Sequence, residues 1–193
     1  MRKLHLSAAI EFSTGTSEER ATAASLGRHP RRSLAPLRGW VLGTLTVGVL
    51  DLLDAFVFFG LRGVAPIWIL HAIASGLLGP QAREGGAATA GLGVLLHFTI
   101  AAGVVGVYFL AGRRLPVLVR RPWICGPLYG LGVYLVMQLV VLPLSAAAVG
   151  GIPRAWPVLL NGLLIHALGV GLPSALWARA ALRPAEMGAV DAN

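Results

Sequence analysis

Two aspartates and two histidines stand in stretches of the chain that are otherwise apolar. Asp51 and Asp54 are three positions apart, which places both carboxylates on one face of a helix. His97 and His166 each lie in a separate apolar stretch that contains no Asp, Glu, Lys or Arg. An ionisable residue in such a stretch costs about 2.5–3.5 kcal/mol to insert into a membrane, so each is a functional candidate. Carboxylates and imidazoles there can carry protons or cations, or bind a metal or a haem.

The polar residues of the apolar stretches fall into two layers when their depth is counted from the end of each stretch. The residues of one layer lie nine or ten positions from the end of their stretch, and those of the other lie five or six positions from it. Because a helix rises about 1.5 Å per residue, the members of each layer lie at about the same depth in the membrane. The candidate cluster consists of Asp51, His97 and His166 in the deeper layer, Asp54, Gln138 and Asn161 in the second layer, and His71, on a shorter segment, which could dip toward the second layer.

Three interpretations of this cluster stay open. In the simplest, the histidines and amides join helices by hydrogen bonds, and the acids pair with them or stay protonated. In the second, the acids and histidines form a proton or cation path. In the third, they bind a transition metal, or His97 and His166 hold a haem between two helices. The sequence has no HExxH motif and a single cysteine, Cys125, so we expect no cofactor, with haem or a transition metal as the alternative.

Motifs typical of enzymes are missing from the sequence. There is no Gly-x-Ser-x-Gly elbow around a serine nucleophile. Ser75 lies four positions after His71, but no third group that would orient the histidine is evident. The sequence therefore predicts that the protein is not an enzyme.

Four apolar stretches are long enough to cross a bilayer and so to position the cluster within it, since a crossing helix needs about 20 residues. Their apolar and polar residues do not alternate, so we expect helices rather than barrel strands. Hydrophobic residues make up 56% of the 193 residues and charged residues 12%, about half the usual charged fraction. The sequence predicts an all-α transmembrane four-helix bundle, with spans at 39–60, 87–111, 123–144 and 156–178.

Small residues recur four positions apart in each expected span, and such pairs allow helix backbones to approach closely. Pro143 and Pro173 lie near the ends of two spans and are expected to bend them. The small pairs are Gly39 and Gly43, Ala102 and Gly106, Gly126 and Gly130, and Ala167 and Gly171.

The segment 64–79 is apolar but only 16 residues long, and prolines and glycines bound it. This length suits a short re-entrant or interfacial helix between the first and second spans. A fifth crossing would separate the arginines before the first span from those at 113–121, against the usual cytoplasmic bias of basic residues.

The distribution of arginine predicts the orientation and the division of the chain. Arginines gather before the first span, between the second and third, and after the fourth, so both termini are expected in the cytoplasm. We expect a disordered cytoplasmic tail at 1–38, a four-span membrane domain at 39–178 and a short cytoplasmic tail at 179–193. The net charge of +8 then follows from topology, and no basic face on a soluble domain indicates nucleic-acid binding.

Several motifs resemble those of a family of small bacterial multi-pass integral membrane proteins that are usually labelled hypothetical. They are SGLLGP at 75–80, EGGAATAGLG at 84–93, LHF at 96–98, GPLYGL at 126–131 and VLPLS at 141–145, together with Asn161 and His166. The resemblance covers residues 39–178 and implies a location in the bacterial inner membrane, without an activity.

The function expected first is a non-enzymatic structural or accessory component of the membrane. The alternatives are a proton- or cation-coupled transporter or channel that uses the Asp/His cluster, and a haem- or metal-binding protein in electron transfer. The expected partners are the lipid bilayer and either further copies of this chain or other membrane subunits.

Overall fold

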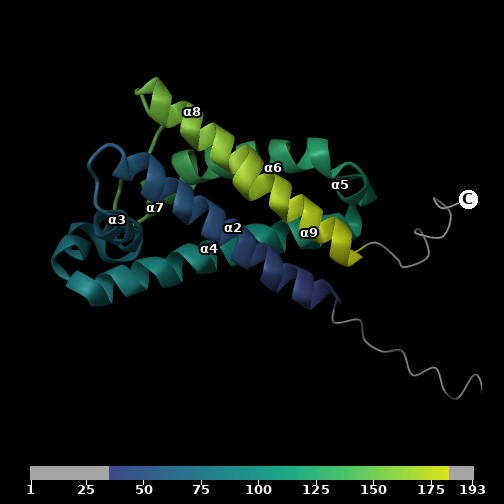
Figure 1. Ribbon diagram of the computed structural model, residues 1–193, viewed down its shortest axis with the longest axis horizontal. Helices are drawn as coiled ribbons and strands as arrows, with labels where there is room; N and C mark the ends of the chain where they lie inside the picture. Colours follow the sequence, from purple (N-terminus) through teal and green to yellow (C-terminus); the bar gives the residue numbers. More distant parts are fainter. Residues whose placement is uncertain (1–34, 183–193) are drawn as a thin grey trace, which may run out of the picture. The chain divides into compact units, whose positions relative to one another are not determined.

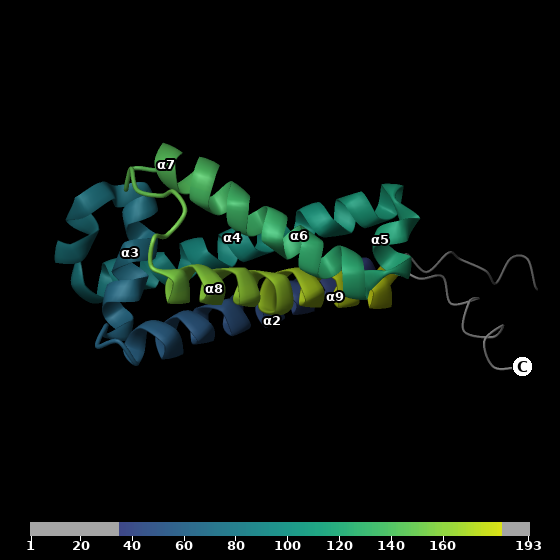
Figure 2. The same cartoon turned by 90° about the horizontal axis from the view of Figure 1, so that it is seen from above.

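The computed structural model describes residues 35–182, and residues 1–34 and 183–193 lie outside the described part. The predicted tails therefore fall almost wholly outside it, except that residues 35–38 and 179–182 continue helices. Residues 35–182 form helices and connecting loops and contain no β-strand. The predicted all-α four-helix bundle is confirmed (Figures 1 and 2).

Four long helical segments are each long and apolar enough to cross a membrane. The first two are single helices, and each of the other two is interrupted by a π-helical turn. The first is α2 (Ala35–Gly60) and the second is α4 (Gly86–Arg114). The third span consists of α6 (Pro122–Val136), η2 (Met137–Val141) and α7 (Leu142–Leu144), and the fourth of α8 (Trp156–Leu164), η3 (Ile165–Gly171) and α9 (Leu172–Leu182).

Three short elements connect the spans. Helix α3 (Pro66–Leu78) and the 3-10 helix η1 (Gly79–Glu84) lie between the first and second spans, and α5 (Pro116–Arg120) lies between the second and third. Both α3 and α5 begin with proline, whose fixed φ and missing N–H suit the first turn of a helix. With 13 residues α3 is about 20 Å long, which is shorter than the hydrocarbon core of a bilayer. A short helix is therefore present where one was expected, and its re-entrant or interfacial position stays a prediction.

The spans begin and end slightly beyond the predicted limits. Helix α2 starts at Ala35 rather than at Gly39, and α4 continues to Arg114. The prediction stopped at arginines because their charge is costly in lipid. At a helix end, however, the long side chain can reach the polar interface while its backbone stays helical.

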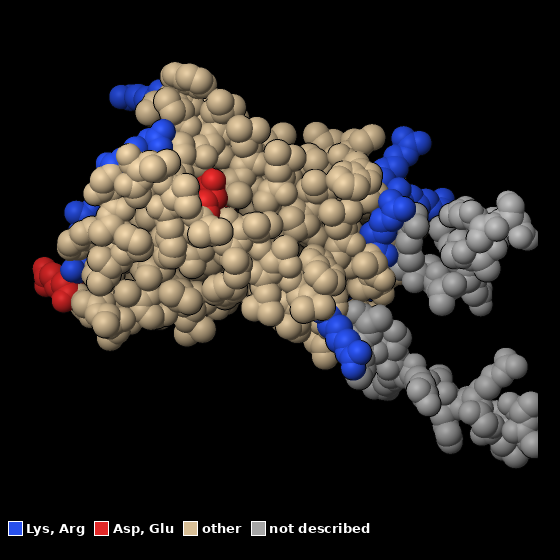
Figure 3. Space-filling view, viewed as in Figure 1, with Lys and Arg blue, Asp and Glu red and all other residues tan. Residues whose placement is uncertain are grey.

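Large apolar side chains on all four spans are exposed. Leu53, Leu95, Leu128 and Leu168, one from each span, are each more than half exposed. Figure 3 shows a broad uncharged surface between basic side chains at the two ends, with one acidic group within it. Such an apolar surface is unfavourable in water and is suited to lipid, so the chain is a multi-pass membrane protein.

The two ends of the bundle differ in their arginine content. We call the end where α2 begins and α9 ends the arginine-rich end, and the opposite end, where α3 lies, the α3 end. The arginine-rich end carries Arg38, Arg113, Arg114, Arg120, Arg121 and Arg179, whereas the α3 end carries Arg62, Arg83 and Arg154.

The arginine-rich end is tightly packed. Val47, Val105, Tyr108 and Ala175 belong to a buried apolar cluster contributed by α2, α4 and α9. Hydrogen bonds cross between helices around it. The Trp40 indole donates to the Ala102 carbonyl, the Trp177 indole to the Thr46 hydroxyl, and the Tyr129 hydroxyl to the Val104 carbonyl, at 3.0, 3.1 and 2.6 Å.

Replacing Trp40 with phenylalanine is expected to lower the free energy of unfolding by about 1 kcal/mol, because the bond to Ala102 is lost. Thermal unfolding in detergent would measure the change. Trp123→Phe is the matched control, since Trp123 is 66% exposed. Equal effects of the two substitutions would contradict a specific role for the Trp40 hydrogen bond.

The predicted small residues lie at the helix contacts. A methyl group on Gly39 would meet Ala181, and one on Gly43 would meet Val105 and Trp177. The closest approach is between the third and fourth spans, where a methyl group on Gly130 would collide with the backbone carbonyl of His166. The interpretation of these pairs as packing positions is confirmed.

Candidate functional site

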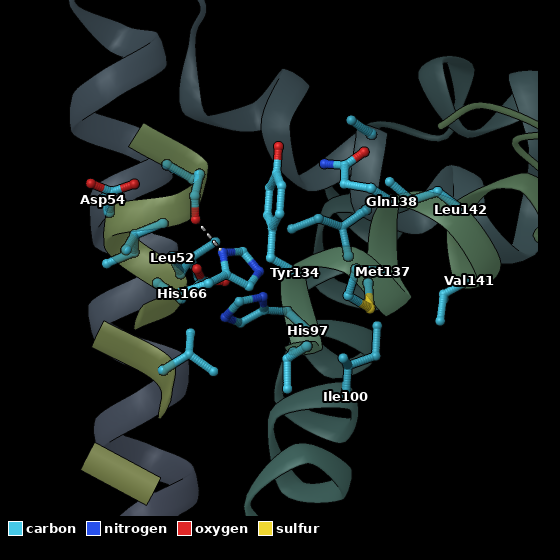
Figure 4. A pocket seen from close by; sticks show the side chains of 18 of the residues that line it. Leu52, Asp54, His97, Ile100, Tyr134, Met137, Gln138, Val141, Leu142 and His166 are labelled. Carbon is cyan, nitrogen blue, oxygen red and sulfur yellow. Dashed lines mark hydrogen bonds between the residues drawn. The ribbon is translucent and has the colours of Figure 1, made fainter. Parts of the chain in front are cut away.

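A cavity of about 630 Å³ lies between the spans on the side toward the α3 end. Its wall is mainly apolar and includes Phe58, Phe59 and Met137. Six of the seven residues predicted to form an intramembrane cluster line it together. They are Asp51, Asp54, His97, Gln138, Asn161 and His166. Figure 4 shows labelled members of this group and their apolar neighbours.

The cavity ends abruptly toward the arginine-rich end. Val47, Ala101 and Val170 line its base and are at most 5% exposed, because they also belong to the packed apolar cluster. On the opposite side, the wall includes residues in or next to the loop before the fourth span, namely Ser145, Val149 and Pro153. The cavity therefore extends from the α3 end to roughly the middle of the bundle.

Two π-helical turns place Gln138 and His166 in the cavity wall. Each turn ends just before a Leu-Pro pair, since η2 precedes Pro143 and η3 precedes Pro173. Proline has no N–H and its ring clashes with the carbonyl four residues earlier, so the preceding turn widens. The carbonyl of Gln138 accepts a 2.8 Å hydrogen bond from the Gly151 N–H, which ties the loop to this turn. The predicted bends are thus π-turns.

Both histidines of the cavity are held by backbone carbonyls. His97 Nε2 lies 2.8 Å from the Gly48 carbonyl on α2, and His166 Nδ1 lies 2.9 Å from the Gly162 carbonyl within its own span. A carbonyl only accepts, so these nitrogens carry the hydrogens. In this neutral tautomer His97 Nδ1 and His166 Nε2 carry no hydrogen. In Figure 4 the two rings extend into the same region from different helices.

The two aspartates have different surroundings. Asp54 Oδ2 accepts a 2.8 Å hydrogen bond from the Asn161 amide, which joins the first and fourth spans. Asp51, one turn closer to Val47 at the base of the cavity, lines it together with His97 and His166.

Tyr134 is a cavity residue that the sequence analysis missed. It is 2% exposed, and its ring packs edge-on against His166 with the centroids 5.2 Å apart. Gly162 makes room for this ring, because a methyl group there would collide with it. Its hydroxyl has no hydrogen-bond partner within residues 35–182. An aromatic residue in an apolar helix resembles ordinary packing, so the one available signal was its position four residues before Gln138.

Tyr134→Phe is expected to leave the free energy of unfolding unchanged or to raise it by about 1 kcal/mol. The substitution removes a buried hydroxyl that has no partner, and with it a desolvation cost. Thermal unfolding without added ligand would test this. A loss of more than about 1 kcal/mol would show that the hydroxyl has a stabilising partner.

His71 lies apart from the other predicted residues. It is 3% exposed, and its Nε2 lies 2.8 Å from the Gly86 carbonyl, so it connects α3 to the start of α4. Helix α3 packs closely along α4, where Gly93 contacts the backbone of Leu70. The Ser75 hydroxyl donates to the Ala72 carbonyl at 2.6 Å rather than to His71. The described contacts give His71 a structural role and form no Ser75–His71 pair.

Within the described residues, no three His, Cys, Asp or Glu side chains are grouped closely enough to hold a metal ion. No known protein family, curated protein or solved structure matches the chain. The defining features of the cavity are two carboxylates, two imidazoles with a free nitrogen each, and a large apolar wall.

Proposed function

We propose that this protein is a carrier of the bacterial inner membrane that exchanges protons for a cation at Asp51, Asp54, His97 and His166. The observation that carries the proposal is the convergence of these residues, from three spans, on one cavity. Intramembrane acids and histidines grouped around a cavity are typical of ion and proton pathways. The role is binding and transport rather than catalysis.

The one-sided cavity supports a carrier rather than an open channel. Transporters commonly bind their substrates near the middle of the membrane and expose the site to one side at a time. Here Val47, Ala101 and Val170 close the base of the cavity, and the packed cluster lies beyond them. We assign this state to a carrier whose site is closed toward the arginine-rich end.

The orientation follows from the arginines. Six described arginines lie at the arginine-rich end and three at the α3 end. Because basic residues favour the cytoplasmic side, we place the arginine-rich end and both termini in the cytoplasm. The cavity then faces the periplasmic side.

The chemistry of exchange follows from charge balance in an apolar site. No Lys or Arg of residues 35–182 lines the cavity, so the carboxylates have no fixed counter-charge there. Without a cation, protons shared with His97 and His166 neutralise them. When a cation enters, it supplies the positive charge and a proton leaves. A structural or accessory role does not require such a cavity.

Reconstituted protein in liposomes with an internal pH-sensitive dye would test this function. A pH gradient is imposed, and Na⁺, K⁺ or butyltriphenylphosphonium is then added outside. We expect proton movement that depends on both the protein and one of these cations. Proton movement equal to that of protein-free liposomes for all three cations would overturn the proposal.

A further inference from the structure

We infer that the cation taken up by this cavity is a lipophilic organic monocation that carries a hydrogen-bond acceptor. The inference rests on the proposed function and names its substrate class. The cavity volume of about 630 Å³ is within the range of sites for drug-sized molecules, roughly 300–1,000 Å³. A bare inorganic cation instead needs several oxygen ligands within about 2.6 Å.

Each span contributes both polar and apolar groups to the wall, whereas α3 contributes apolar side chains alone. Asp51 and Asp54 come from α2, and Asn161 and His166 come from the fourth span beside it. The side chains from α3 are apolar and include Ile69, Ile73 and Leu77. A ligand with one charged centre and an apolar body matches this division, with its charge toward α2 and its body against α3.

Charge selects a cation over an anion or a neutral molecule. Two carboxylates face a cavity whose described lining contains no Lys or Arg. An anion would be repelled by the carboxylates, and a neutral molecule would gain no charge attraction from them.

The hydroxyl of Tyr134 indicates the acceptor. Tyr134 lines the cavity and is 2% exposed, yet its hydroxyl has no partner within residues 35–182. Buried hydroxyl groups almost always have a hydrogen-bond partner. An ether or carbonyl oxygen on the ligand would accept from this hydroxyl.

Equilibrium dialysis of the purified full chain in detergent would test the charge requirement. The probes are butyltriphenylphosphonium and butyltriphenylsilane, which has the same four substituents on silicon but no charge and no hydrogen-bond acceptor. We expect the cation to bind at least about tenfold more tightly, a difference of about 1.4 kcal/mol. Asp51→Asn and Asp54→Asn should each weaken cation binding by about tenfold or more, while Glu84→Gln, which removes an exposed acid outside the cavity, should not.

The inferred hydrogen-bond acceptor of the ligand is tested with (2-methoxyethyl)triphenylphosphonium, in which an ether oxygen takes the place of one methylene group of the butyl chain. Wild type should bind the ether several-fold more tightly than the butyl compound, and Tyr134→Phe should remove that difference without weakening the butyl compound. If wild type binds both cations equally, the inference that the ligand carries a hydrogen-bond acceptor is wrong. Equal binding of the neutral and cationic probes would overturn the inference, and this comparison needs no variant to fold.

The two proposals fail separately. Release of protons by Na⁺ or K⁺ without binding of the organic cations would refute the substrate class and leave the carrier function standing. Binding of the organic cations without proton movement in liposomes would refute the carrier function and leave the binding site standing.

Discussion

Asp51→Asn is expected to reduce cation-dependent proton movement to the level of protein-free liposomes. Asparagine has nearly the same shape as aspartate, but its amide cannot bind or release a proton near neutral pH. Asp51 is the deeper acid of the cavity that it lines with His97 and His166, and the proposed exchange requires a carboxylate there that can bind and release a proton. Asp54→Asn should leave the contact between the first and fourth spans in place, because asparagine can still accept a hydrogen bond from Asn161.

The same variant is expected to be as stable as wild type or more so. An ionisable group in an apolar site has a desolvation cost that asparagine reduces, and functional residues often lower stability in this way. Glu84→Gln is the control, since Glu84 is exposed in η1 and lies outside the cavity. Transport that survives Asp51→Asn in a folded protein would contradict the role given to Asp51.

Gly130→Ala and Gly132→Ala are expected to change stability in opposite directions. The methyl group on Gly130 would collide with the carbonyl of His166, and neither backbone can move without separating the third and fourth spans. We expect a loss of about 1–3 kcal/mol or more, as in overpacked interiors. At Gly132 the methyl group would meet nothing within 4 Å, so alanine should stabilise the helix by up to about 1 kcal/mol.

Thermal unfolding of both variants in one detergent would measure this difference. Because the contact involves His166, Gly130→Ala should also weaken cation binding, whereas Gly132→Ala should not. Equal stabilities of the two variants would show that the third and fourth spans do not approach each other at Gly130.

The sequence predicted the spans and most of the cavity for simple physical reasons. Charged residues are so costly in lipid that Asp51 and His166 stood out in apolar stretches, and the fixed rise of a helix converted their positions into depth. Depth alone cannot say which helix face a residue occupies. For that reason the prediction included His71, whose short helix instead directs it to the Gly86 carbonyl.

The features that were missed depend on contacts between helices. Tyr134 belongs to the cavity because Gly162, on another span, leaves room for its ring. From the sequence we expected only a bend at Pro143 and Pro173. The structure shows a π-helical turn immediately before Leu142-Pro143 and before Leu172-Pro173. The bond from Trp40 to Ala102 joins residues 62 positions apart, and no local pattern encodes it.

Proton release on cation binding tests the central claim, that protons and a cation share the aspartates of one cavity, most directly. Purified protein in weakly buffered detergent solution is mixed with a saturating cation, and the change in pH is recorded. We expect about one proton released per cation bound, from wild type and from Glu84→Gln, and none from the double variant Asp51→Asn, Asp54→Asn. Cation binding by wild type without proton release would contradict the account.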